Sequence, residues 1–343
     1  MSLKEFDFLL PSEQIASKPL KRRDASRMLF VNRNSNSFED RRFADIVGLL
    51  SEQDVLVLNN TRVFPARLIG ESESGGKIEV LLEEEIAENR WQVLAKPAKR
   101  LKKGKRLHFA DDLDCEVLER NDEGRVILQF DNGLDLWEIF DRVGKTPLPH
   151  YIKRNDVDLE DDRERYQTIY AEKRGAIAAP TAGLHFTPEL LDDLRNNGVS
   201  IVELTLHVGY GTFEPVRVED LSEHHVLPER LELTQEAADE LNKAKADGKR
   251  IVAVGTTTTR ALESCIDDAG KFVSQTAKTS LTVTPGYKFR AVDALLTNFH
   301  LPRSSLLILV STFGTHDLIM NAYKHAVVSG YRFYSYGDCM FIE

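Results

Sequence analysis

The sequence predicts an α/β protein in which a mostly parallel sheet core is interrupted by an inserted small antiparallel β-barrel. Strand-like and helix-like segments alternate near the N-terminus and again over the second half of the chain, as they do in parallel sheets covered by helices. Between these regions, six short strand candidates follow one another without a helix, which favours a barrel. The chain has 343 residues, 42% of them hydrophobic, which suffices for two cores. We therefore expect a discontinuous core over residues 1–66 and 149–343 and an inserted domain over residues 67–148.

The first sixty residues predict the start of the core. Residues 28–33 (MLFVNR) and 54–60 (DVLVLNN) are short apolar runs and predict strands, the second of them buried. Residues 43–50 (FADIVGLL) place their apolar side chains at helical spacing and predict a helix between these strands.

From about Pro65 the pattern changes to short strands separated by turn residues. The strand candidates are residues 66–70, 77–83, 90–95, 105–110, 115–120 and 125–130. Turn signals such as residues 74–76 (SGG) separate them. Residues 134–144 then predict a helix, and residues 145–151 (KTPLPHY), with two prolines, predict a linker back to the core.

The second part of the core alternates strands with helices. The predicted strands are residues 175–180, 200–208, 249–255, 294–299 and 331–337. The predicted helices are residues 187–198, 234–248, 256–270 and 316–330. A further segment, residues 303–314, begins after Pro302. Thr187 and Thr234 are suited to cap two of the helices, which Gly198 and Gly248 end.

Composition and charge exclude several classes of protein. The net charge of −10 argues against a protein that coats nucleic acid non-specifically, although a local basic surface is compatible with it. Cys115, Cys265 and Cys339 form no metal-binding or disulfide spacing, which indicates a reducing, cytoplasmic location. The N-terminus does not resemble a signal peptide, and the longest apolar run, residues 306–310, is far too short to span a membrane.

Polar residues follow the predicted parallel strands at their carboxyl ends, where open α/β sheets bind ligands. In chain order they are Thr181, Gly183, His185, His207, Gly209, Gly211, Thr212, Glu214, Thr256–Arg260, Asn298 and His300. Three of the four strand ends bring a histidine, and we expect these side chains to converge if the strands are parallel. A single strand-end histidine is more often a hydrogen-bonded structural residue, and this alternative stays open for each of them.

Two of these strand ends have competing interpretations. Residues 255–260 (GTTTTR) start a helix whose free amides suit a carboxylate or phosphate, but they fit a plain threonine-capped helix equally well. Residues 209–214 (GYGTFE) resemble a glycine-rich nucleotide loop but lack its third glycine. The sequence contains no P-loop, nucleophile-elbow or HExxH motif, and it has no metal-ligand spacing.

Two basic runs occur in this otherwise acidic chain. Residues 96–106 (KPAKRLKKGKR) carry seven basic residues in eleven and lie in the expected β-domain. Residues 18–27 (KPLKRRDASR) carry five. Each run fits either a solvated loop or a surface that faces a polyanion, and the sequence does not separate these two interpretations.

Seven motifs, in order along the chain, closely resemble those of the S-adenosylmethionine:tRNA ribosyltransferase-isomerase family of queuosine biosynthesis. They are VLNNTRVFPARL, KPAKRLKKG, GAIAAPTAGLHFT, TLHVGYGTFEPV, VAVGTTTTRALES, LLTNFHLPRSSLL and YRFYSYGDCMFI. The resemblance runs from about residue 6 to the last residues. It implies an α/β domain with an inserted antiparallel β-barrel, which agrees with the strand pattern above, and a monomer.

The resemblance also implies a reaction. The family transfers and isomerises the ribosyl part of S-adenosylmethionine onto 7-aminomethyl-7-deazaguanine at the tRNA wobble position, giving epoxyqueuosine and releasing adenine and methionine. S-adenosylmethionine is a consumed substrate, so no metal or other cofactor is implied. The sulfonium acidifies the ribose 5′ carbon, and a histidine that is neutral near pH 7 suits the base that removes this proton.

Under this resemblance, we expect each group of residues to have a role. His185, His207 and His300 are the candidates for proton transfer, and Asp338 is a further candidate donor to the departing adenine. The residues expected to bind S-adenosylmethionine are Thr181, Gly183, Phe186, Gly209, Tyr210, Gly211, Thr212, Phe213, Glu214, Thr256, Thr257, Arg260, Asn298 and Phe299. The residues expected to bind tRNA are Arg62, Lys96, Lys99, Arg100, Lys102 and Lys103.

Three positions depart from the family's usual motifs. Asn60 stands where an aspartate is usual, His150 where a proline is usual, and Leu227 where a histidine is usual. An essential base at the position of Asn60 or Leu227 is therefore disfavoured, which shifts the expectation toward the three histidines. Two alternatives remain: another S-adenosylmethionine-dependent RNA-modifying enzyme, such as a methyltransferase, and a non-catalytic tRNA-binding protein.

Overall fold

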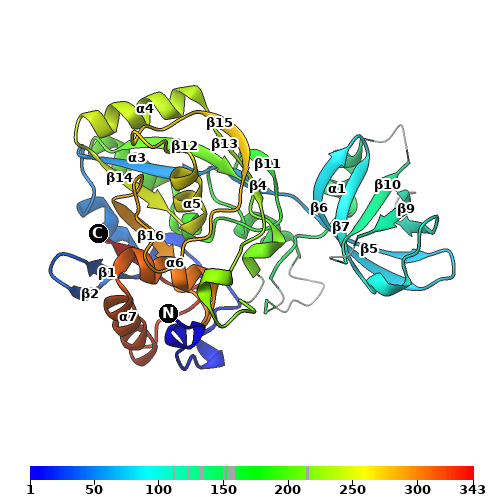
Figure 1. Ribbon diagram of the computed structural model, residues 1–343, viewed down its shortest axis with the longest axis horizontal. Coiled ribbons are helices and arrows are strands. Elements are labelled where there is room, and N and C mark those ends of the chain that lie inside the picture. The colour runs from blue at the N-terminus through cyan, green and yellow to red at the C-terminus, as the bar shows by residue number, and fades with distance from the viewer. Residues whose placement is uncertain (111–112, 122–123, 132–134, 150, 153–158, 214–215) are drawn as a thin grey trace.

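The computed structural model has two lobes, a larger α/β core and a smaller β-barrel, joined by two chain segments (Figure 1). It describes residues 1–343 except 111–112, 122–123, 132–134, 150, 153–158 and 214–215. The joining segments lie side by side, because the Arg67 amide donates to the Lys145 carbonyl at 3.2 Å and the Lys145 amide to the Arg67 carbonyl at 2.9 Å. The predicted fold class, an α/β core with an inserted antiparallel barrel, is confirmed.

Within the described residues, the core sheet has nine strands in the order β15–β13–β12–β3–β14–β16–β17–β1–β2. Their bounds are β1 Arg27–Asn32, β2 Ser37–Arg42, β3 Asp54–Asn59, β12 Ser200–Leu206, β13 Glu229–Leu233, β14 Arg250–Val254, β15 Gln275–Thr279, β16 Ala294–Asn298 and β17 Cys339–Ile342. The central strands β12, β3, β14 and β16 are parallel, and antiparallel pairs extend the sheet on both sides. The carboxyl ends of the central strands therefore meet at one edge.

Both faces of the sheet are covered. Val55 and Val57 of β3 belong to an apolar cluster shared with helices α4 (Gln235–Ala246), α5 (Thr256–Ser264), α6 (Ser305–Gly314) and α7 (His316–Val328). Leu56 and Leu58 belong to the opposite cluster, with helix α3 (Pro188–Asn196) and the short 3₁₀-helix η4 (Phe43–Gly48). Successive side chains of a strand point to opposite faces, so the continuous apolar run of β3 is buried on both.

The barrel is closed by strands in the order β10–β7–β6–β5–β8–β9. Their bounds are β5 Arg67–Ser72, β6 Lys77–Ala87, β7 Arg90–Lys96, β8 Arg106–Phe109, β9 Asp114–Arg120 and β10 Val126–Phe130. Helix α1 (Leu136–Val143) adds Phe140 to the barrel's apolar cluster, edge-on to Trp91 at a centroid distance of 5.3 Å. The barrel thus has a core of its own.

Short elements connect these parts. The other elements are β4 Thr61–Val63, β11 Lys173–Ala176, α2 Leu159–Arg165, η1 Leu3–Phe6, η2 Ser12–Gln14, η3 Arg23–Ala25, η5 Ala98–Arg100, η7 Thr181–His185, η8 Tyr210–Phe213 and η9 Leu221–Glu223. The predicted helix caps are confirmed: Thr187 accepts from the Leu190 amide and Thr234 from the Ala237 amide, both at 3.2 Å. Among the described residues, no helix is both long and apolar enough to cross a membrane.

The closing strand predicted at residues 331–337 is wrong. Tyr334 has φ +75°, and the Gly337 amide turns back to the Tyr334 carbonyl at 3.0 Å. The Arg332 amide donates to the Asp338 carboxylate at 2.8 Å. Because these amides are used in turns, residues 331–337 cannot pair with a neighbouring strand of the sheet. The last strand of the sheet is instead β17, which begins at Cys339 and pairs with β1 and β16.

Three other predicted elements are only partly correct. The helix expected over residues 256–270 ends at Ser264, the last residue of α5. Residues 175–180 form a strand only up to Ala176, where β11 pairs with β4 in a separate two-stranded sheet. The chain then leaves the strand and enters η7 after Pro180, which has no amide to donate to a ladder. Residues 43–50 form the 3₁₀-helix η4 rather than an α-helix.

Candidate active site

The carboxyl ends of β14 and β16 open onto a small cavity, here named the strand-end cavity. The predicted site residues that line it are Thr181, Thr256, Thr257, Asn298 and His300. Val208 brings the end of β12 to the same cavity, so all four expected strand ends converge there. Tyr166, Tyr334 and Ser335, which sequence reasoning missed, also line it.

Gly255 positions the start of α5 at this cavity. Its φ of +95° turns the chain from β14 into the helix, and its amide donates to the Leu296 carbonyl of β16 at 2.7 Å. The hydroxyls of Thr258 and Thr259 donate to the carbonyls of Val254 and Gly255 at the end of β14, at 2.6 and 3.1 Å. The hydroxyl of Thr257 is buried and has no hydrogen-bond partner in the described part of the chain. The hydroxyls of Thr258 and Thr259 therefore have backbone partners, whereas the hydroxyl of Thr257 is available to a ligand.

Tyr166 contributes a second buried hydroxyl without a partner among the described residues. Its side chain is fully buried, and burial raises the pKa of the phenol well above its usual value. The hydroxyl is therefore protonated and can donate a hydrogen bond into the cavity. Tyr166 follows an acidic stretch and belongs to no motif, so no local pattern indicates it as a site residue.

His300 lines the strand-end cavity directly after β16. Its Nε2 lies 2.9 Å from the Thr297 hydroxyl, and its amide donates to the Tyr323 hydroxyl at 3.0 Å. Burial lowers its pKa to about 3, which keeps the ring neutral at pH 7. His300 is therefore an uncharged imidazole facing the cavity.

His185 contacts the same strand end from a second small pocket, which it lines together with Ser26. Its Nε2 lies 3.2 Å from Asn298 Oδ1, and its Nδ1 lies 2.8 Å from the Ser26 hydroxyl. Asn298 Nδ2 donates to the Tyr334 carbonyl at 2.9 Å, so Oδ1 is an acceptor and His185 carries its proton on Nε2. Burial lowers the pKa of His185 to about 4. Both ring nitrogens are occupied, and the ring holds Asn298 in place.

His207 does not line the strand-end cavity, although it lies next to Val208. Its Nδ1 is 2.8 Å from the Thr61 hydroxyl, and its ring lies against Gly175. A Cβ on Gly175, whose φ is +147°, would lie 2.7 Å from the ring. Burial, followed by the charge of Arg230, lowers the pKa of His207 to about 4. The structure thus places His300 at the strand-end cavity and His185 against Asn298, which also lines it, and leaves His207 outside.

Three other predicted site residues lie in the cores instead of lining the cavity. The Asp338 carboxylate accepts the amides of Arg27 and Arg332, at 2.9 and 2.8 Å, and burial raises its pKa. Phe186 packs edge-on against Phe43 at 5.0 Å, and Phe299 packs against aromatic residues of the other cluster. Both rings are fully buried by protein side chains.

Arg260, expected to bind the methionyl carboxylate, is already paired. Its Nη1 forms a buried ion pair with Glu229, and its Nε donates to the Leu281 carbonyl at 2.9 Å. Glu229 also accepts the amide of Gly209 at 2.8 Å. Arg260 lines a separate small pocket rather than the strand-end cavity.

The glycines of the predicted site allow close approaches. A Cβ on Gly183 would lie 2.0 Å from the Tyr170 hydroxyl, and one on Gly211 would lie 2.9 Å from Leu227 Cβ. The backbone of Thr212 and Phe213 belongs to η8, but their side chains are not described. Glu214 lies outside the described residues, as does His150.

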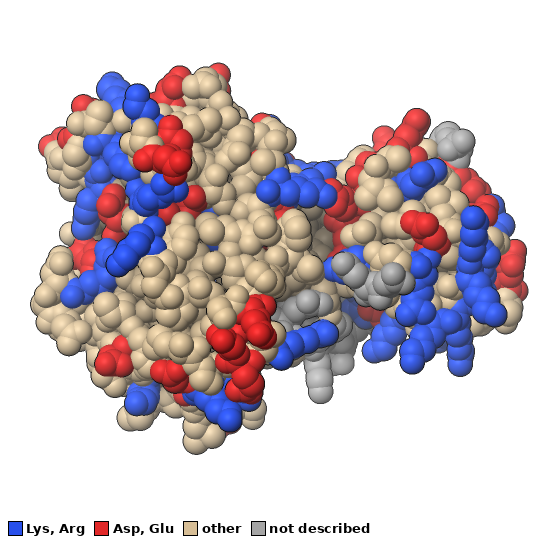
Figure 2. All heavy atoms as spheres, in the orientation of Figure 1, with Lys and Arg blue, Asp and Glu red and all other residues tan. Residues whose placement is uncertain are grey.

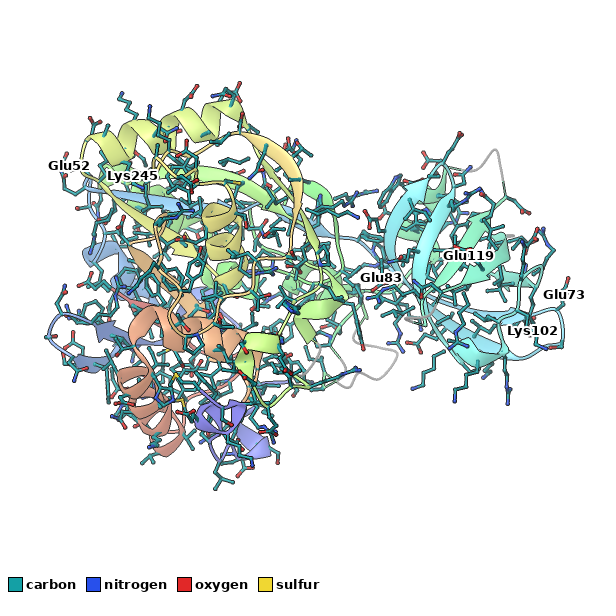
Figure 3. The ribbon with its side chains drawn as sticks, in the orientation of Figure 1. Glu52, Glu73, Glu83, Lys102, Glu119 and Lys245 are labelled. Atoms are coloured by element: carbon teal, nitrogen blue, oxygen red, sulfur yellow. The ribbon has the colours of Figure 1, made fainter. Side chains whose placement is uncertain are left out.

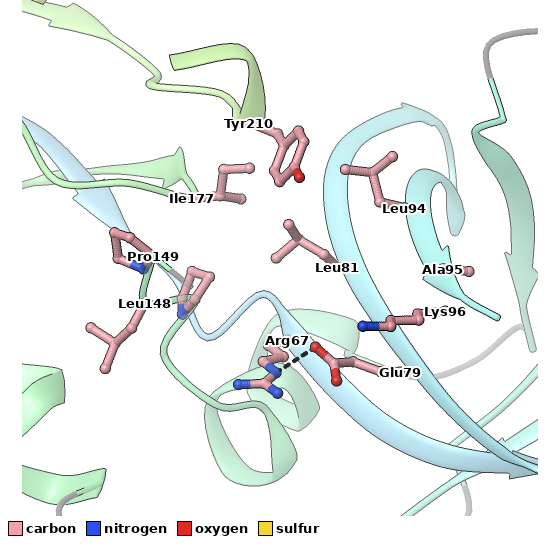
Figure 4. A pocket seen from close by; sticks show the side chains of 11 residues that line it. Arg67, Glu79, Leu81, Leu94, Ala95, Lys96, Leu148, Pro149, Ile177 and Tyr210 are labelled. Carbon is pink, nitrogen blue, oxygen red and sulfur yellow. Dashed lines mark ion pairs between the residues drawn. The ribbon is translucent and has the colours of Figure 1, made fainter. Parts of the chain in front are cut away.

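A larger cavity, here named the junction cavity, lies between the barrel and the core. It has a volume of about 400 Å³, and Figure 4 shows the side chains around it. The barrel lines it with Arg67, Glu79, Leu81, Leu94, Ala95 and Lys96, and the core and linker line it with Pro147, Leu148, Pro149, Ile177 and Tyr210. Tyr210 is thus a predicted site residue that faces this second cavity.

The two cavities share a wall. Ile177 and Tyr210 line the junction cavity, whereas Ala178, which follows Ile177, and Val208, two residues before Tyr210, line the strand-end cavity. The two segments are joined by the Ile177 amide, which donates to the Val208 carbonyl at 3.0 Å. Groups bound on the two sides of this wall are therefore separated by one layer of chain.

The basic residues predicted to bind tRNA are exposed. Arg62, Lys96, Lys99, Arg100, Lys102 and Lys103 form no ion pair within the part of the chain that the structure describes. Lysine and arginine side chains gather along the lower side of the barrel lobe in Figure 2. Lys96 lies at the junction cavity, and Lys102 lies at the end of the barrel that faces away from the core (Figures 3 and 4). The run of residues 96–106 thus forms a largely unneutralised track.

The other basic run, residues 18–27, is used differently. Arg22 pairs with Asp24 at 2.7 Å, and Arg23 donates to the carbonyls of Leu184 and Glu164 at 3.2 and 3.1 Å. Arg27 pairs with Asp40 at 3.0 Å. Arg22 is paired within its own segment, whereas Arg23 and Arg27 attach the segment to the core, so these three arginines have a structural explanation.

The residues that depart from the family's motifs have partners suited to their types. The amide of Asn60 accepts from the Thr205 hydroxyl at 2.7 Å and donates to Glu203 at 3.1 Å. Leu227 packs over Gly211. Neither residue lines the strand-end cavity. In the described part of the chain, no three His, Cys, Asp or Glu side chains are grouped to hold a metal ion.

Comparisons with known proteins cover the whole chain. A model of a queuosine biosynthesis protein family matches residues 3–342. The chain is 48% identical to an S-adenosylmethionine:tRNA ribosyltransferase-isomerase from Staphylococcus haemolyticus and 45% identical to one from Desulforamulus reducens, over 100% of each pair of chains. The crystal structure of an S-adenosylmethionine tRNA ribosyltransferase from Thermotoga maritima is similar, with 36% identity and a TM-score of 0.57 over 99% of this chain and 100% of that one.

Proposed function

The chain belongs to the queuosine biosynthesis family, and we propose that it acts as an S-adenosylmethionine:tRNA ribosyltransferase-isomerase. In this reaction the ribosyl part of S-adenosylmethionine is transferred to 7-aminomethyl-7-deazaguanine at the wobble position of tRNA and isomerised. The products are epoxyqueuosine in the tRNA, adenine and methionine. S-adenosylmethionine is consumed as a substrate, and the proposal includes no further cofactor.

The observation that supports this function at the strand-end cavity is its pair of buried hydroxyls without a protein partner, Tyr166 and Thr257. A buried polar group without a partner lowers stability, so such groups at a cavity indicate that a ligand completes their hydrogen bonds. S-adenosylmethionine offers suitable acceptors in its ribose hydroxyls and its carboxylate. The start of α5, beside Thr256 and Thr257, adds amides that favour a carboxylate.

His300 is the base that this arrangement favours. Its ring is neutral and lies at the cavity, whereas both nitrogens of His185 already have partners. Burial makes His300 a weak base, with a pKa of about 3. A substrate carboxylate in the same cavity would stabilise the imidazolium and raise this pKa, which improves proton removal from the carbon next to the sulfonium. His185 acts as a positioning residue, because it holds the Asn298 side chain.

Donor binding must widen the strand-end cavity. Without ligand it encloses about 50 Å³, and pockets for ligands of this size usually hold roughly 300–1,000 Å³. Displacement of the wall between the strand-end cavity and the junction cavity would join the two cavities. We therefore expect S-adenosylmethionine in the strand-end cavity and the acceptor base in the junction cavity to come into contact where this wall lies in the ligand-free protein.

Product analysis tests the proposed function. The purified protein is incubated with S-adenosylmethionine and tRNA that carries 7-aminomethyl-7-deazaguanine, and tRNA with an ordinary guanine at the wobble position serves as the control. We expect free adenine and methionine only with the modified tRNA. S-adenosylhomocysteine would indicate a methyltransferase instead, and tRNA binding without any turnover would indicate a non-catalytic binding protein.

A further inference from the structure

The junction cavity has the dimensions and walls of a site for one nucleobase. Its volume of about 400 Å³ is within the usual range for ligand pockets. Leu81 and Leu94 of the barrel face Ile177 of the core across it, and the Tyr210 ring lies above them (Figure 4). An aromatic ring among aliphatic side chains is the setting in which RNA-binding proteins hold a base that has left its stack.

One side of this cavity is polar. Arg67 Nε lies 2.8 Å from Glu79 Oε1, although its N–H does not point at that oxygen, so the pair is held by charge rather than by a hydrogen bond. The two side chains are 41% and 39% exposed, and Glu79 is not otherwise hydrogen-bonded within the described residues. The second carboxylate oxygen is therefore available to accept hydrogen bonds.

A carboxylate at this place distinguishes between purines. The pairing edge of a guanine-type base carries two neighbouring donors, the ring N–H and the exocyclic amino group, which match the two oxygens of a carboxylate. The pairing edge of adenine presents an acceptor where guanine has the ring N–H. Glu79 thus favours a guanine-type base over the adenine of S-adenosylmethionine.

The charge around the cavity matches an RNA strand. The Lys96 ammonium points toward the Arg67–Glu79 pair at the edge of the cavity (Figure 4). The exposed basic run continues along the chain from Lys96 to Lys102, which lies at the end of the barrel that faces away from the core (Figure 3). Phosphates that follow this track would deliver a nucleotide of the same strand to the cavity.

From these observations we propose that the junction cavity binds the wobble base of the tRNA, turned out of its stack, with Tyr210 against its face and Glu79 on its pairing edge. The inference rests on the proposed function for the choice of tRNA. The base's 7-substituent then faces Ile177, whose neighbour Ala178 lines the strand-end cavity. Tyr210 is thereby assigned to the acceptor base rather than to S-adenosylmethionine.

Filling the cavity tests its occupant. In Leu81→Trp the larger side chain occupies the cavity, and Ile69→Trp, on the exposed face of the neighbouring strand β5, is the matched control. Binding of an anticodon stem-loop with guanine at the wobble position is measured alongside binding of S-adenosylmethionine alone. We expect Leu81→Trp to weaken stem-loop binding about tenfold or more, the equivalent of losing one stacked base, and to leave S-adenosylmethionine binding unchanged.

Two outcomes of this experiment overturn the proposal. Loss of S-adenosylmethionine binding with intact stem-loop binding would mean that the donor occupies the junction cavity. Unchanged binding of both ligands in a folded Leu81→Trp variant would mean that the cavity holds neither.

Base recognition by Glu79 has a separate test, which stays informative even if Leu81→Trp does not fold. Stem-loops with guanine or inosine at the wobble position differ only in the exocyclic amino group. We expect the wild type to prefer guanine about tenfold, the lower end of the discrimination that a good base contact provides. Glu79→Gln should lose this preference, whereas Glu71→Gln, an exposed change on β5, should keep it. An equal preference in the wild type and Glu79→Gln overturns the assignment of Glu79.

Failure of this inference is distinguishable from failure of the proposed function. Both binding experiments use a stem-loop that is not turned over. If the protein releases no adenine with the modified tRNA and yet shows the guanine preference through Glu79, the cavity assignment stands and the enzymatic proposal falls. If the protein releases adenine and both Leu81→Trp and Glu79→Gln bind the stem-loop like the wild type, the enzymatic proposal stands and the cavity assignment falls.

Discussion

The histidines at the strand ends differ in what their ring nitrogens contact. His185 is bound on both sides, by Asn298 and Ser26, and His207 packs on Gly175 beside Thr61. His300 is the histidine whose ring lines the strand-end cavity. Three residues that look equivalent along the chain are therefore expected to contribute unequally to the reaction.

Removing the His300 imidazole tests this ranking. We predict that His300→Ala lowers turnover by about two to four orders of magnitude, the usual contribution of a general base, with little change in tRNA affinity. His207→Ala is the matched variant, and its effect should be smaller because that ring does not line the cavity. Single-turnover adenine release and tRNA binding measure the two quantities. Equal losses in both variants would contradict the ranking.

The unpartnered hydroxyl of Tyr166 gives a second prediction at this scale. Tyr166→Phe removes a buried group that has no protein partner in the described residues, so the melting temperature should stay the same or rise. The value of kcat/KM should fall about tenfold if the hydroxyl binds substrate. Tyr170→Phe is the control, because its hydroxyl is also buried without a partner but does not line the cavity. Unchanged kinetics for Tyr166→Phe would remove the residue from the site.

The depressed pKa values of the buried histidines predict a dependence of stability on pH. In the unfolded chain His300 binds a proton near pH 6.5, whereas in the folded protein its pKa is about 3. Between these values the unfolded state binds more protons, so the free energy of unfolding falls as the pH decreases from 6.5 toward 3. We predict that the melting temperature of His300→Gln falls less steeply over this range than that of the wild type. Parallel curves would contradict the burial of a neutral ring.

Part of the site could be predicted from single residues in the sequence. Asn298, His300 and Thr257 follow predicted strands, and the rule that parallel strands end at one edge was enough to group them. Tyr166 was not predictable, because it enters the cavity from a distant segment without a motif. The pairing of Arg260 with Glu229 was also hidden, since the two are neighbours only after β13 and α5 pack together.

At the scale of elements, the turn from β14 into α5 is the feature on which the strand-end cavity depends. Gly255 has φ +95° and ψ 154°, a conformation that is almost restricted to glycine. A Cβ there would meet nothing closer than 3.6 Å, so the cost of a substitution is conformational rather than steric. A side chain at this position should therefore strain the helix start without clashing.

Gly255→Ala should lower the free energy of unfolding by about 1–3 kcal/mol, the cost of holding a non-glycine residue in this region. It should also weaken S-adenosylmethionine binding, because Thr256 and Thr257 follow directly. Gly248→Ala, which ends α4 at φ +74° with nothing within 4 Å, is the control for strain alone. Calorimetry and donor binding separate the two effects, and equal donor binding in both variants would contradict the role of this turn.

The elements that were predicted correctly are those with local signals. The caps at Thr187 and Thr234 and the apolar run of β3 are set by neighbours in sequence. The strand expected at residues 331–337 failed because its alternating aromatic side chains fit a strand, while its amides are taken by Asp338 and by turns. The amides of Phe333 and Tyr334 also donate to the carbonyls of Gln14 and Phe299, and such long-range partners have no signature in a local pattern.

In the whole molecule, basic side chains line one side of the smaller lobe although the protein carries a net charge of −10. We predict that reversing the charges of Lys99, Arg100, Lys102 and Lys103 weakens tRNA binding. The dependence of log Kd on log salt should flatten by about 0.7–0.9 for each phosphate contact that is lost. Reversing the exposed Lys4, Lys243, Lys271 and Lys324 of the core changes the net charge equally and is the control. Equal effects of the two sets would mean that only net charge matters.

The central claim is that the donor gives up its ribosyl group and not its methyl group. Tracing labelled carbon through the reaction tests it most directly, with S-adenosylmethionine labelled either in the ribose or in the methyl group and tRNA carrying 7-aminomethyl-7-deazaguanine. We predict that the ribose label enters the tRNA, while the methyl label is recovered in methionine and unlabelled adenine is released. Methyl label in the tRNA, with the ribose label left in S-adenosylhomocysteine, would contradict it.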